Sequence, residues 1–163
     1  MSQSMRLKYP ERNNAKMRSS FHLGAAFAPH LLGPYRRLSS TPILFSPDSL
    51  KPLAAEDPYV WHCGGRYHLL FKAMQFLKSC RLRSGQLAYT SSVDLKHWNP
   101  PVPAFNRTFA WRSPNSPTSR YEKVDRLERP QALVVDGRLK HVFCASVTAT
   151  QDARNIAMLV NSE

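Results

Sequence analysis

The sequence predicts an all-β fold, which we expect to be an incomplete β-propeller of about two blades preceded by the last strand of another blade. Three observations support this prediction. Short apolar runs rich in aromatic and β-branched residues are separated by Gly-Gly, Asp-Gly and proline-containing turns. The 13 prolines are spread along the chain and disfavour long helices. One strand–turn–strand pattern occurs twice, and a repeat of that size suits a propeller blade.

We expect one folded domain, residues 21–163, after a basic tail at residues 1–20. A chain of 163 residues has the usual length of a single domain, and its 42% hydrophobic content excludes a wholly disordered protein. No apolar stretch approaches the roughly 18 residues that a membrane-spanning helix needs, so we expect no membrane span. The tail is polar and basic, which predicts disorder, although an organelle transit peptide has a similar composition.

The first elements follow from local patterns. The apolar run 21–28 predicts the last strand of the preceding blade. Residues 39–53 are rich in serine and proline, which favours a surface loop. Residues 58–61 and 66–72 flank Gly64-Gly65, and two extended runs around a pair of glycines are typical of a β-hairpin.

The remaining elements complete the two predicted blades. Residues 86–91 predict a third strand, and residues 96–98 predict the start of a fourth. Residues 99–117 contain five prolines, too many for a central strand, and are predicted to form a loop. Residues 131–135 and 138–143 then flank an Asp-Gly turn, which predicts a second hairpin.

The two hairpins resemble each other position by position. Shifting the first by 72 residues gives six identities in eighteen aligned positions, although two unrelated hairpins can also agree by chance. We interpret the identities as an internal repeat with one blade per unit. The identical pairs are Glu56 and Glu128, Pro58 and Pro130, Gly65 and Gly137, Arg66 and Arg138, Phe71 and Phe143, and Ala73 and Ala145.

Each repeat opens with acidic residues close before a proline, at the mouth of its first strand. Glu56 and Asp57 precede Pro58, and Glu128 comes two residues before Pro130. In a propeller the innermost strands line the central channel, so these carboxylates are expected to converge. Glycoside hydrolysis needs two convergent carboxylates, a proton donor and a base, separated by roughly 6.5–9.5 Å in inverting enzymes. Turn and capping roles are the structural alternative for all three acids.

Basic and aromatic residues near these acids are candidates for substrate contacts. Arg126 and Arg129 lie close to Glu128, where they can bind sugar hydroxyls or lower the pKa of the acid; surface ion pairs are the alternative. Trp61 and His68 lie in the first hairpin, and an aromatic face suits the apolar side of a sugar ring, although sheet cores also bury such residues. We expect no metal or other cofactor, because the histidines lack ligand spacing such as HxxxH and no phosphate-binding loop is present.

Several motifs follow one another in a characteristic order. They are Gly33-Pro34-Tyr35, Ala54–Trp61 with Gly65–Phe71, Ala88–Ser91 with His97-Trp98, and Leu127–Gln131 with Asp136-Gly137. This order resembles that of the five-bladed β-propeller glycoside hydrolases, and the closest likeness is to proteins related to glycoside hydrolase family 43. The resemblance runs from about Phe21 to Val160 and rests on the order of the motifs rather than on any one of them.

The resemblance implies a catalytic trio, namely an Asp base from an early blade, an Asp that orients and tunes the acid, and a Glu general acid. On that pattern Asp57 is the tuning aspartate and Glu128 is the general acid. Glu56, beside Asp57, is a further candidate for substrate contacts. The early blade that supplies the base is missing from this sequence, so we expect little or no hydrolysis by the chain alone. Within the chain, Glu56, Asp94 and Asp125 are the alternatives for a base.

The predicted function is therefore that of a glycosidase-like protein, which hydrolyses O-glycosyl bonds of an oligo- or polysaccharide by a carboxylic acid/base mechanism. The alternative is a carbohydrate-binding pseudoenzyme that holds sugar without catalysis. The net charge of +12 also suits a nucleic-acid binder, but no RNP, zinc-finger or helix-turn-helix motif is present, and we expect no nucleic-acid partner. Because an unclosed propeller leaves sheet edges unpaired, the chain can associate with another copy through them.

Overall fold

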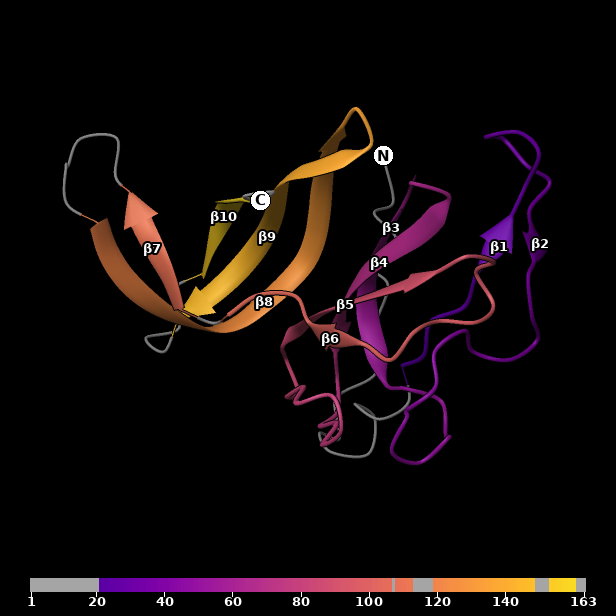
Figure 1. Cartoon of the computed structure of the whole chain (residues 1–163), viewed down its shortest axis with the longest axis horizontal. Helices are drawn as coiled ribbons and strands as arrows, with labels where there is room; N and C mark the ends of the chain where they lie inside the picture. Colours follow the sequence, from indigo (N-terminus) through magenta and orange to yellow (C-terminus); the bar gives the residue numbers. More distant parts are fainter. Residues whose placement is uncertain (1–20, 107, 113–118, 149–152, 161–163) are drawn as a thin grey trace, which may run out of the picture.

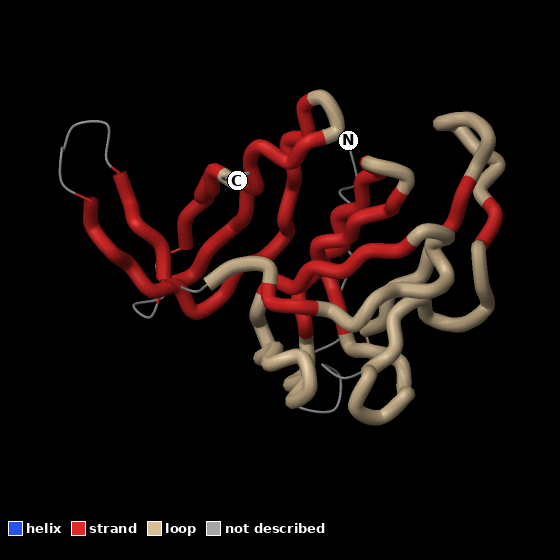
Figure 2. The backbone as a smooth tube through the Cα atoms, viewed as in Figure 1, coloured by secondary structure: helices blue, strands red, loops and turns tan. Residues whose placement is uncertain are grey.

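The computed structural model describes residues 21–106, 108–112, 119–148 and 153–160. Within these residues the chain is all-β, with a two-stranded ribbon, two four-stranded antiparallel sheets and no helix (Figures 1 and 2). The predicted all-β, incomplete propeller-like fold is therefore confirmed. The described residues also contain no helix that could cross a membrane. The tail predicted at residues 1–20 lies outside them.

A short ribbon precedes the first sheet. β1 (Ala26–Phe27) pairs antiparallel with β2 (Arg36–Arg37), and the ribbon projects from one end of the molecule (Figure 1). It occupies the place predicted for the last strand of a preceding blade, with two residues of the predicted strand 21–28 paired in it. Before the ribbon, the carbonyl of Phe21 accepts a hydrogen bond from the N–H of Ala55, which ties this segment to the first sheet.

The first sheet is a meander of β3 (Ala55–Cys63), β4 (Arg66–Ala73), β5 (Leu87–Ser92) and β6 (Val102–Pro103). The turn between β3 and β4 is Gly64-Gly65, with φ angles of 57° and 71°. A type I′ turn needs a positive φ at both central residues, which glycine adopts without strain. The first predicted hairpin and the third strand are therefore confirmed.

The second sheet is a meander of β7 (Thr108–Arg112), β8 (Ser119–Val135), β9 (Arg138–Thr148) and β10 (Ala153–Leu159). β8 is long enough to pair with β7 along its first residues and with β9 along the rest. The turn between β8 and β9 is Asp136-Gly137, with φ angles of 50° and 72°, which again fits type I′. The second predicted hairpin is confirmed, and both of its strands are longer than predicted.

The predicted loop at residues 99–117 is wrong at two places, because it contains both β6 and β7. Residues 113–118 of that segment lie outside the described residues. β6 tolerates proline because it is the edge strand of its sheet, where Pro103 lies opposite Ala88 and no further strand needs its missing N–H. The proline count therefore excluded a central strand but not an edge strand.

The segment predicted to start the fourth strand, residues 96–98, forms a turn instead. Asp94 accepts hydrogen bonds from the backbone N–H groups of Lys96 and His97, at 2.9 and 2.8 Å. Such side-chain bonds offer the backbone an alternative to strand pairing. Trp98 forms one isolated antiparallel β-bridge with Ser92 of β5, and no strand continues from it in the described chain.

The repeat in the sequence is also a repeat of backbone geometry. Both β3 and β8 carry a β-bulge just after the shared glutamate, Glu56 in one and Glu128 in the other. The next residue has a positive φ in both strands, 55° at Asp57 and 52° at Arg129. A bulge inserts one extra residue and bends its strand, so the two glutamates occupy equivalent positions at equivalent bends.

The later part of the repeat is shifted by one residue. Lys140 of β9 has no partner residue in β8, whereas β4 has no such extra residue. Phe71, which is fully buried, therefore corresponds to the buried Cys144 and not to Phe143, which is 44% exposed. The last identity of the sequence alignment is lost in the same way, so two of the six aligned pairs are not structural equivalents.

The two sheets pack face to face, and β8 lies against the first sheet (Figure 1). Alternation along β4 sends Leu70 toward the second sheet and Phe71 away from it. We call the buried residues between the sheets the inter-sheet core. Its members are Leu70, Leu87, Val124, Leu127, Val142, Cys144, Ile156 and Met158.

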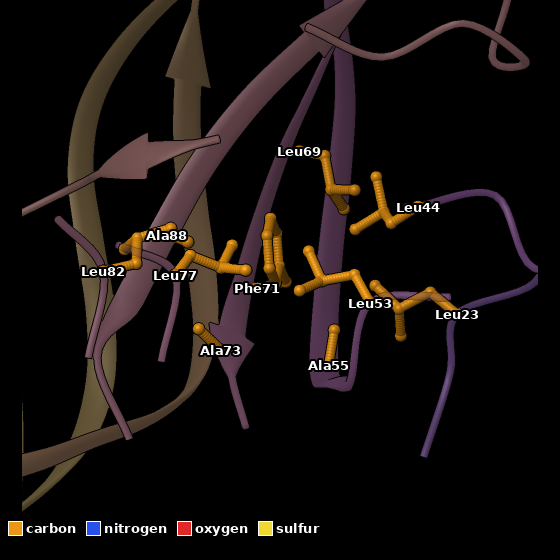
Figure 3. Close-up of a cluster of buried hydrophobic side chains, with 10 residues drawn as sticks. All are labelled: Leu23, Leu44, Leu53, Ala55, Leu69, Phe71, Ala73, Leu77, Leu82 and Ala88. Atoms are coloured by element: carbon orange, nitrogen blue, oxygen red, sulfur yellow. The ribbon is translucent and has the colours of Figure 1, made fainter. Parts of the chain in front are cut away.

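The other face of the first sheet is covered by the segment before it and by loops. Phe71 lies at the centre of this second cluster, which we call the outer core (Figure 3). The first sheet is thus buried on both faces, as a sheet inside a layered fold should be. The members of the outer core are Leu23, Leu44, Leu53, Ala55, Leu69, Phe71, Ala73, Leu77, Leu82 and Ala88.

Candidate functional site

Lys72 joins the two sheets through a pair of carboxylates. Its Nζ lies 2.7 Å from Oε1 of Glu56 and 2.7 Å from Oε1 of Glu128. The lysine side chain is 7% exposed, whereas the two glutamate side chains are 29% and 26% exposed. One nearly buried cation therefore pairs with two partly exposed anions, one from each repeat, and a buried charge needs such partners. We call these three residues the carboxylate–lysine cluster.

The bulges bring the three side chains together. Alternation along β4 places Lys72 on the face of the first sheet that packs against the second. The bulge in β3 shifts the register by one residue, so that Glu56 rather than Asp57 lies opposite Lys72. Glu128 stands at the equivalent bulge of β8 and approaches the same lysine from the second sheet.

Asp57, the predicted tuning aspartate, makes a different contact. Its Oδ2 accepts a hydrogen bond from the backbone N–H of Arg129, at 3.2 Å. The structure thus brings Asp57 to the residue that follows Glu128, across the interface between the sheets. In this arrangement the Asp57 carboxylate fixes the backbone beside the predicted general acid.

The surroundings of Glu128 favour its charged form. The hydrogen bond from Lys72 lowers the pKa of Glu128 below its usual value against the opposing effect of burial, and the charges of Arg126 and Arg129 also lower it. A general acid at neutral pH needs a raised pKa, so that it still holds its proton. As it stands, Glu128 is an anion that accepts hydrogen bonds rather than a proton donor.

Arg126 and Arg129 border the cluster on its exposed side. Nη1 of Arg126 lies 3.8 Å from Oε1 of Glu128, and the arginine side chain is 46% exposed. An exposed pair of this length contributes about 1 kcal/mol or less. Arg129 is exposed, and its contact with Asp57 is made by the backbone. Both guanidinium groups are therefore accessible to a ligand.

Trp61 and His68 face each other across β3 and β4, on the same face of the first sheet as Lys72. Their rings are stacked, with centroids 5.1 Å apart and planes 16° from parallel. Nδ1 of His68 is hydrogen-bonded to the hydroxyl of Tyr89 at 2.7 Å, and its Nε2 lies 3.1 Å from the carbonyl oxygen of Cys63. Because both ring nitrogens of His68 already have hydrogen-bond partners, we assign His68 a role in holding the ring of Trp61 rather than in binding a ligand.

Two tyrosines complete an aromatic cluster with Trp61 and His68. The ring centroids of Tyr59 and Tyr89 each lie 6.3 Å from that of Trp61. The hydroxyl of Tyr59 also donates to the carbonyl of Ala132 in β8, at 2.8 Å, so this cluster too reaches the second sheet. The aromatic and carboxylate–lysine clusters are continuous along one face, since its successive cross-strand pairs are Glu56–Lys72, Tyr59–Leu70 and Trp61–His68.

The alternatives for a base lie in different settings. Asp94 is engaged by the backbone N–H and the ring of His97, and these bonds hold the pKa of Asp94 far below its usual value. Asp125 lies in β8. Glu56 is the alternative that the structure joins to Glu128, through Lys72. In the described part of the chain no three His, Cys, Asp or Glu side chains are gathered as ligands for a metal ion.

Lys72 and Tyr59 are site residues that the sequence patterns do not single out. One signal for Lys72 is present, because it is the only charged residue in the apolar run Leu69–Ala73. A charge inside a buried strand usually has an ion-pair partner. No comparable signal marks Tyr59, whose hydroxyl contact depends on how the two sheets pack.

Comparisons with family models, with curated proteins and with solved structures give no match to this chain. The class that the described residues define is an all-β, partly propeller-like protein. The likeness to propeller glycoside hydrolases related to family 43 therefore stays a proposal that rests on the order of the sequence motifs.

Proposed function

We propose that this chain is a glycoside-hydrolase-like protein that binds an oligo- or polysaccharide along the carboxylate–lysine and aromatic clusters, with little hydrolysis by the chain alone. One observation carries the proposal. Carboxylates from two equivalent bulges, Glu56 and Glu128, meet at Lys72 on the face that also carries Trp61.

The chemistry of this surface suits a sugar. Carboxylates accept hydrogen bonds from sugar hydroxyls, and the exposed guanidinium groups of Arg126 and Arg129 donate them. Trp61 is half-buried, stacked on His68 and packed at the margin of the inter-sheet core, and we infer that the part of its ring left exposed meets the apolar side of a sugar. Polar groups beside an aromatic platform therefore cover both the hydroxyl-bearing and the apolar sides of a carbohydrate.

The same geometry argues against efficient catalysis by these residues. Lys72 stabilises the deprotonated form of Glu128, which opposes a role as general acid. The second carboxylate, Glu56, is held by the same ammonium group. A ligand that displaced or neutralised Lys72 would be needed before either acid could exchange a proton with a glycosidic oxygen.

Hydrolysis is the second candidate, and the closeness of the two carboxylates is compatible with it. Oε1 of Glu56 and Oε1 of Glu128 each lie 2.7 Å from one nitrogen, so they are at most twice that distance apart. The carboxyl groups of retaining glycosidases are separated by roughly 5–5.5 Å, which is compatible with this arrangement. On this alternative Glu128 is the acid and Glu56 takes the place of the missing partner.

An activity assay separates the two candidates. The purified chain and the Glu128→Gln variant are incubated with a panel of aryl glycosides and of plant and algal polysaccharides, with Asp136→Asn at the exposed β8–β9 turn as the matched control. We expect no turnover above the buffer rate from any of the three. Turnover by the wild type and the control that is lost in Glu128→Gln would overturn the proposal of binding without hydrolysis and establish the second candidate.

A further inference from the structure

A cavity of about 290 Å³ opens between two loops, residues 43–53 and 96–101. None of its lining residues belongs to the carboxylate–lysine or the aromatic cluster. Its lining includes Leu44 and Leu53, which are 3% and 0% exposed and belong to the outer core (Figure 3). Ligand pockets usually enclose about 300–1,000 Å³, so a cavity of this size suits a small molecule.

The wall of the cavity is mainly apolar and contains several flat rings. Trp98, which is half-buried, and Phe45, which is 48% exposed, contribute aromatic rings. Pro47, Pro100 and Pro101 add three pyrrolidine rings. Aromatic side chains pack favourably against a second aromatic ring in offset or edge-to-face arrangements. The wall therefore favours a planar apolar group such as a phenyl ring.

Hydrogen bonds fix both loops that form this wall. The backbone N–H of Ser46 donates to the carbonyl of Lys51 at 2.8 Å, which closes the first loop. In the second loop, the indole N–H of Trp98 donates to the carbonyl of Leu95 at 3.0 Å. A cavity whose walls are already ordered spares a ligand the entropic cost of ordering them.

The charged side chains that line the cavity are cationic. Lys96 and His97 line it, whereas none of the described lining residues is an Asp or Glu. The carboxylate of Asp48 is turned to two backbone N–H groups of the β4–β5 connection. Asp94 binds the backbone of the second loop and Nδ1 of His97, at 2.6 Å. This leaves the ammonium group of Lys96 and Nε2 of the 87% exposed His97 for a ligand.

We propose that this cavity binds a small aromatic carboxylate. The ring of the ligand lies against Trp98 and Phe45, and its carboxylate is bound at the edge of the cavity by Lys96 and His97. Hydrogen bonds between a cation and a carboxylate are roughly twice as strong as those between neutral groups. A neutral compound with the same ring should therefore bind more weakly. The site is separate from the proposed carbohydrate site, so the two proposals can fail separately.

An NMR titration of the full chain with 3-phenylpropionate tests the proposal. The chain has three tryptophans, so its indole N–H region contains three signals, and the Trp98→Phe variant identifies the one from Trp98. We expect this signal to shift and saturate as 3-phenylpropionate is added, while the Trp61 signal stays in place. The neutral analogue 3-phenyl-1-propanol should shift the same signal with a higher Kd.

A double variant tests the cationic part of the site. Lys96→Met with His97→Gln should raise the Kd for 3-phenylpropionate by about fivefold, the upper end of what exposed ion pairs contribute. Lys51→Met with His62→Gln is the matched control, because it makes the same two substitutions at exposed residues outside the cavity lining. Its Kd should equal that of the wild type. Circular dichroism checks that both variants are folded.

Four results would overturn the proposal. The first is a Trp98 signal that does not shift or does not saturate. The second is a shift at Trp61 alone, which would place the ligand at the aromatic cluster. The third is a Kd that is equal for the wild type and the Lys96→Met/His97→Gln variant. The fourth is equally tight binding of 3-phenyl-1-propanol. If the double variant does not fold, Lys96→Met alone is compared with Lys51→Met.

Discussion

The carboxylate of Asp57 accepts a hydrogen bond from the backbone N–H of Arg129, and these two residues are each other's equivalents in the two repeats. The bond is 3.2 Å long, and the two residues have φ angles of 55° and 52°. A side chain of the first bulge thus holds the backbone of the second. Each bulge carries a glutamate into the carboxylate–lysine cluster, so this bond links the two backbone segments from which Glu56 and Glu128 reach Lys72.

Replacing Asp57 should separate its conformational role from its charge. Alanine at a positive φ is strained by about 1–2 kcal/mol, and the hydrogen bond to Arg129 is lost as well. We therefore expect Asp57→Ala to lower the free energy of unfolding by about 1–3 kcal/mol. Asp57→Asn keeps an oxygen acceptor and tolerates this conformation, so it should lose well under half as much. Urea denaturation measures both, and equal losses would show that the charge is what matters.

Removing Lys72 should leave two carboxylates without their shared cation. We expect Lys72→Met to lower the free energy of unfolding by about 1–3 kcal/mol, less than for a fully buried pair because the two glutamates are partly exposed. The pKa of Glu128 should rise, since its main stabilising contact is gone and Glu56 repels it. NMR titration of the Glu128 side-chain carboxyl measures this shift. An unchanged pKa in Lys72→Met would contradict the arrangement.

The lowered pKa of Glu128 also predicts how stability depends on pH. A carboxyl whose pKa is lower in the folded state stabilises the fold above its unfolded pKa, near 4.5, and this stabilisation disappears as the pH falls through the folded value. The wild type should therefore exceed Glu128→Gln in stability at neutral pH, and the difference should shrink below about pH 4.5. Taking the difference removes the contribution of Asp94, whose pKa is also lowered. Urea denaturation at several pH values measures this difference in the free energy of unfolding. A difference that grows as the pH falls would contradict a lowered pKa of Glu128.

Phe71 should be a main determinant of stability in the first sheet. It is fully buried at the centre of the outer core (Figure 3), whereas Phe76 is 63% exposed. Deleting a buried phenylalanine side chain costs about 3–5 kcal/mol through lost burial and the cavity left behind. Phe71→Ala should therefore lower the midpoint of thermal unfolding strongly, and Phe76→Ala should shift it little. Similar shifts in both variants would contradict this packing.

The sequence predicted the parts of the fold that depend on short-range chemistry. Gly64-Gly65 and Asp136-Gly137 each permit the positive φ angles of a two-residue turn, and both hairpins form there. The edge strand containing Pro103 was missed, because a proline count does not show whether a strand needs a partner on both sides. The insertion at Lys140 was missed too, so Phe143 was aligned with a residue on the other face.

The site was only partly predictable for the same reason. The sequence pattern indicates Glu56 and Glu128 as candidate site residues, because each stands shortly before a proline at the start of a hairpin. Counting residue pairs outward from the turn places Asp57 opposite Lys72, but the bulge puts Glu56 there. A proline such as Pro58 fits either the first residue of a strand or a bulge within it, so the local sequence does not decide between the two registers. Lys72 therefore emerges as the centre of the site only in the structure.

The most direct test of carbohydrate binding is affinity electrophoresis on neutral plant and algal polysaccharides, which exclude retention by net charge alone. We expect at least one polysaccharide to slow the wild type and Trp61→Ala to lose most of that retardation. His62→Ala should behave as the wild type, because His62 is exposed on the opposite face of β3. Migration unaffected by every polysaccharide, or equal retardation of the wild type and Trp61→Ala, would contradict the proposed site.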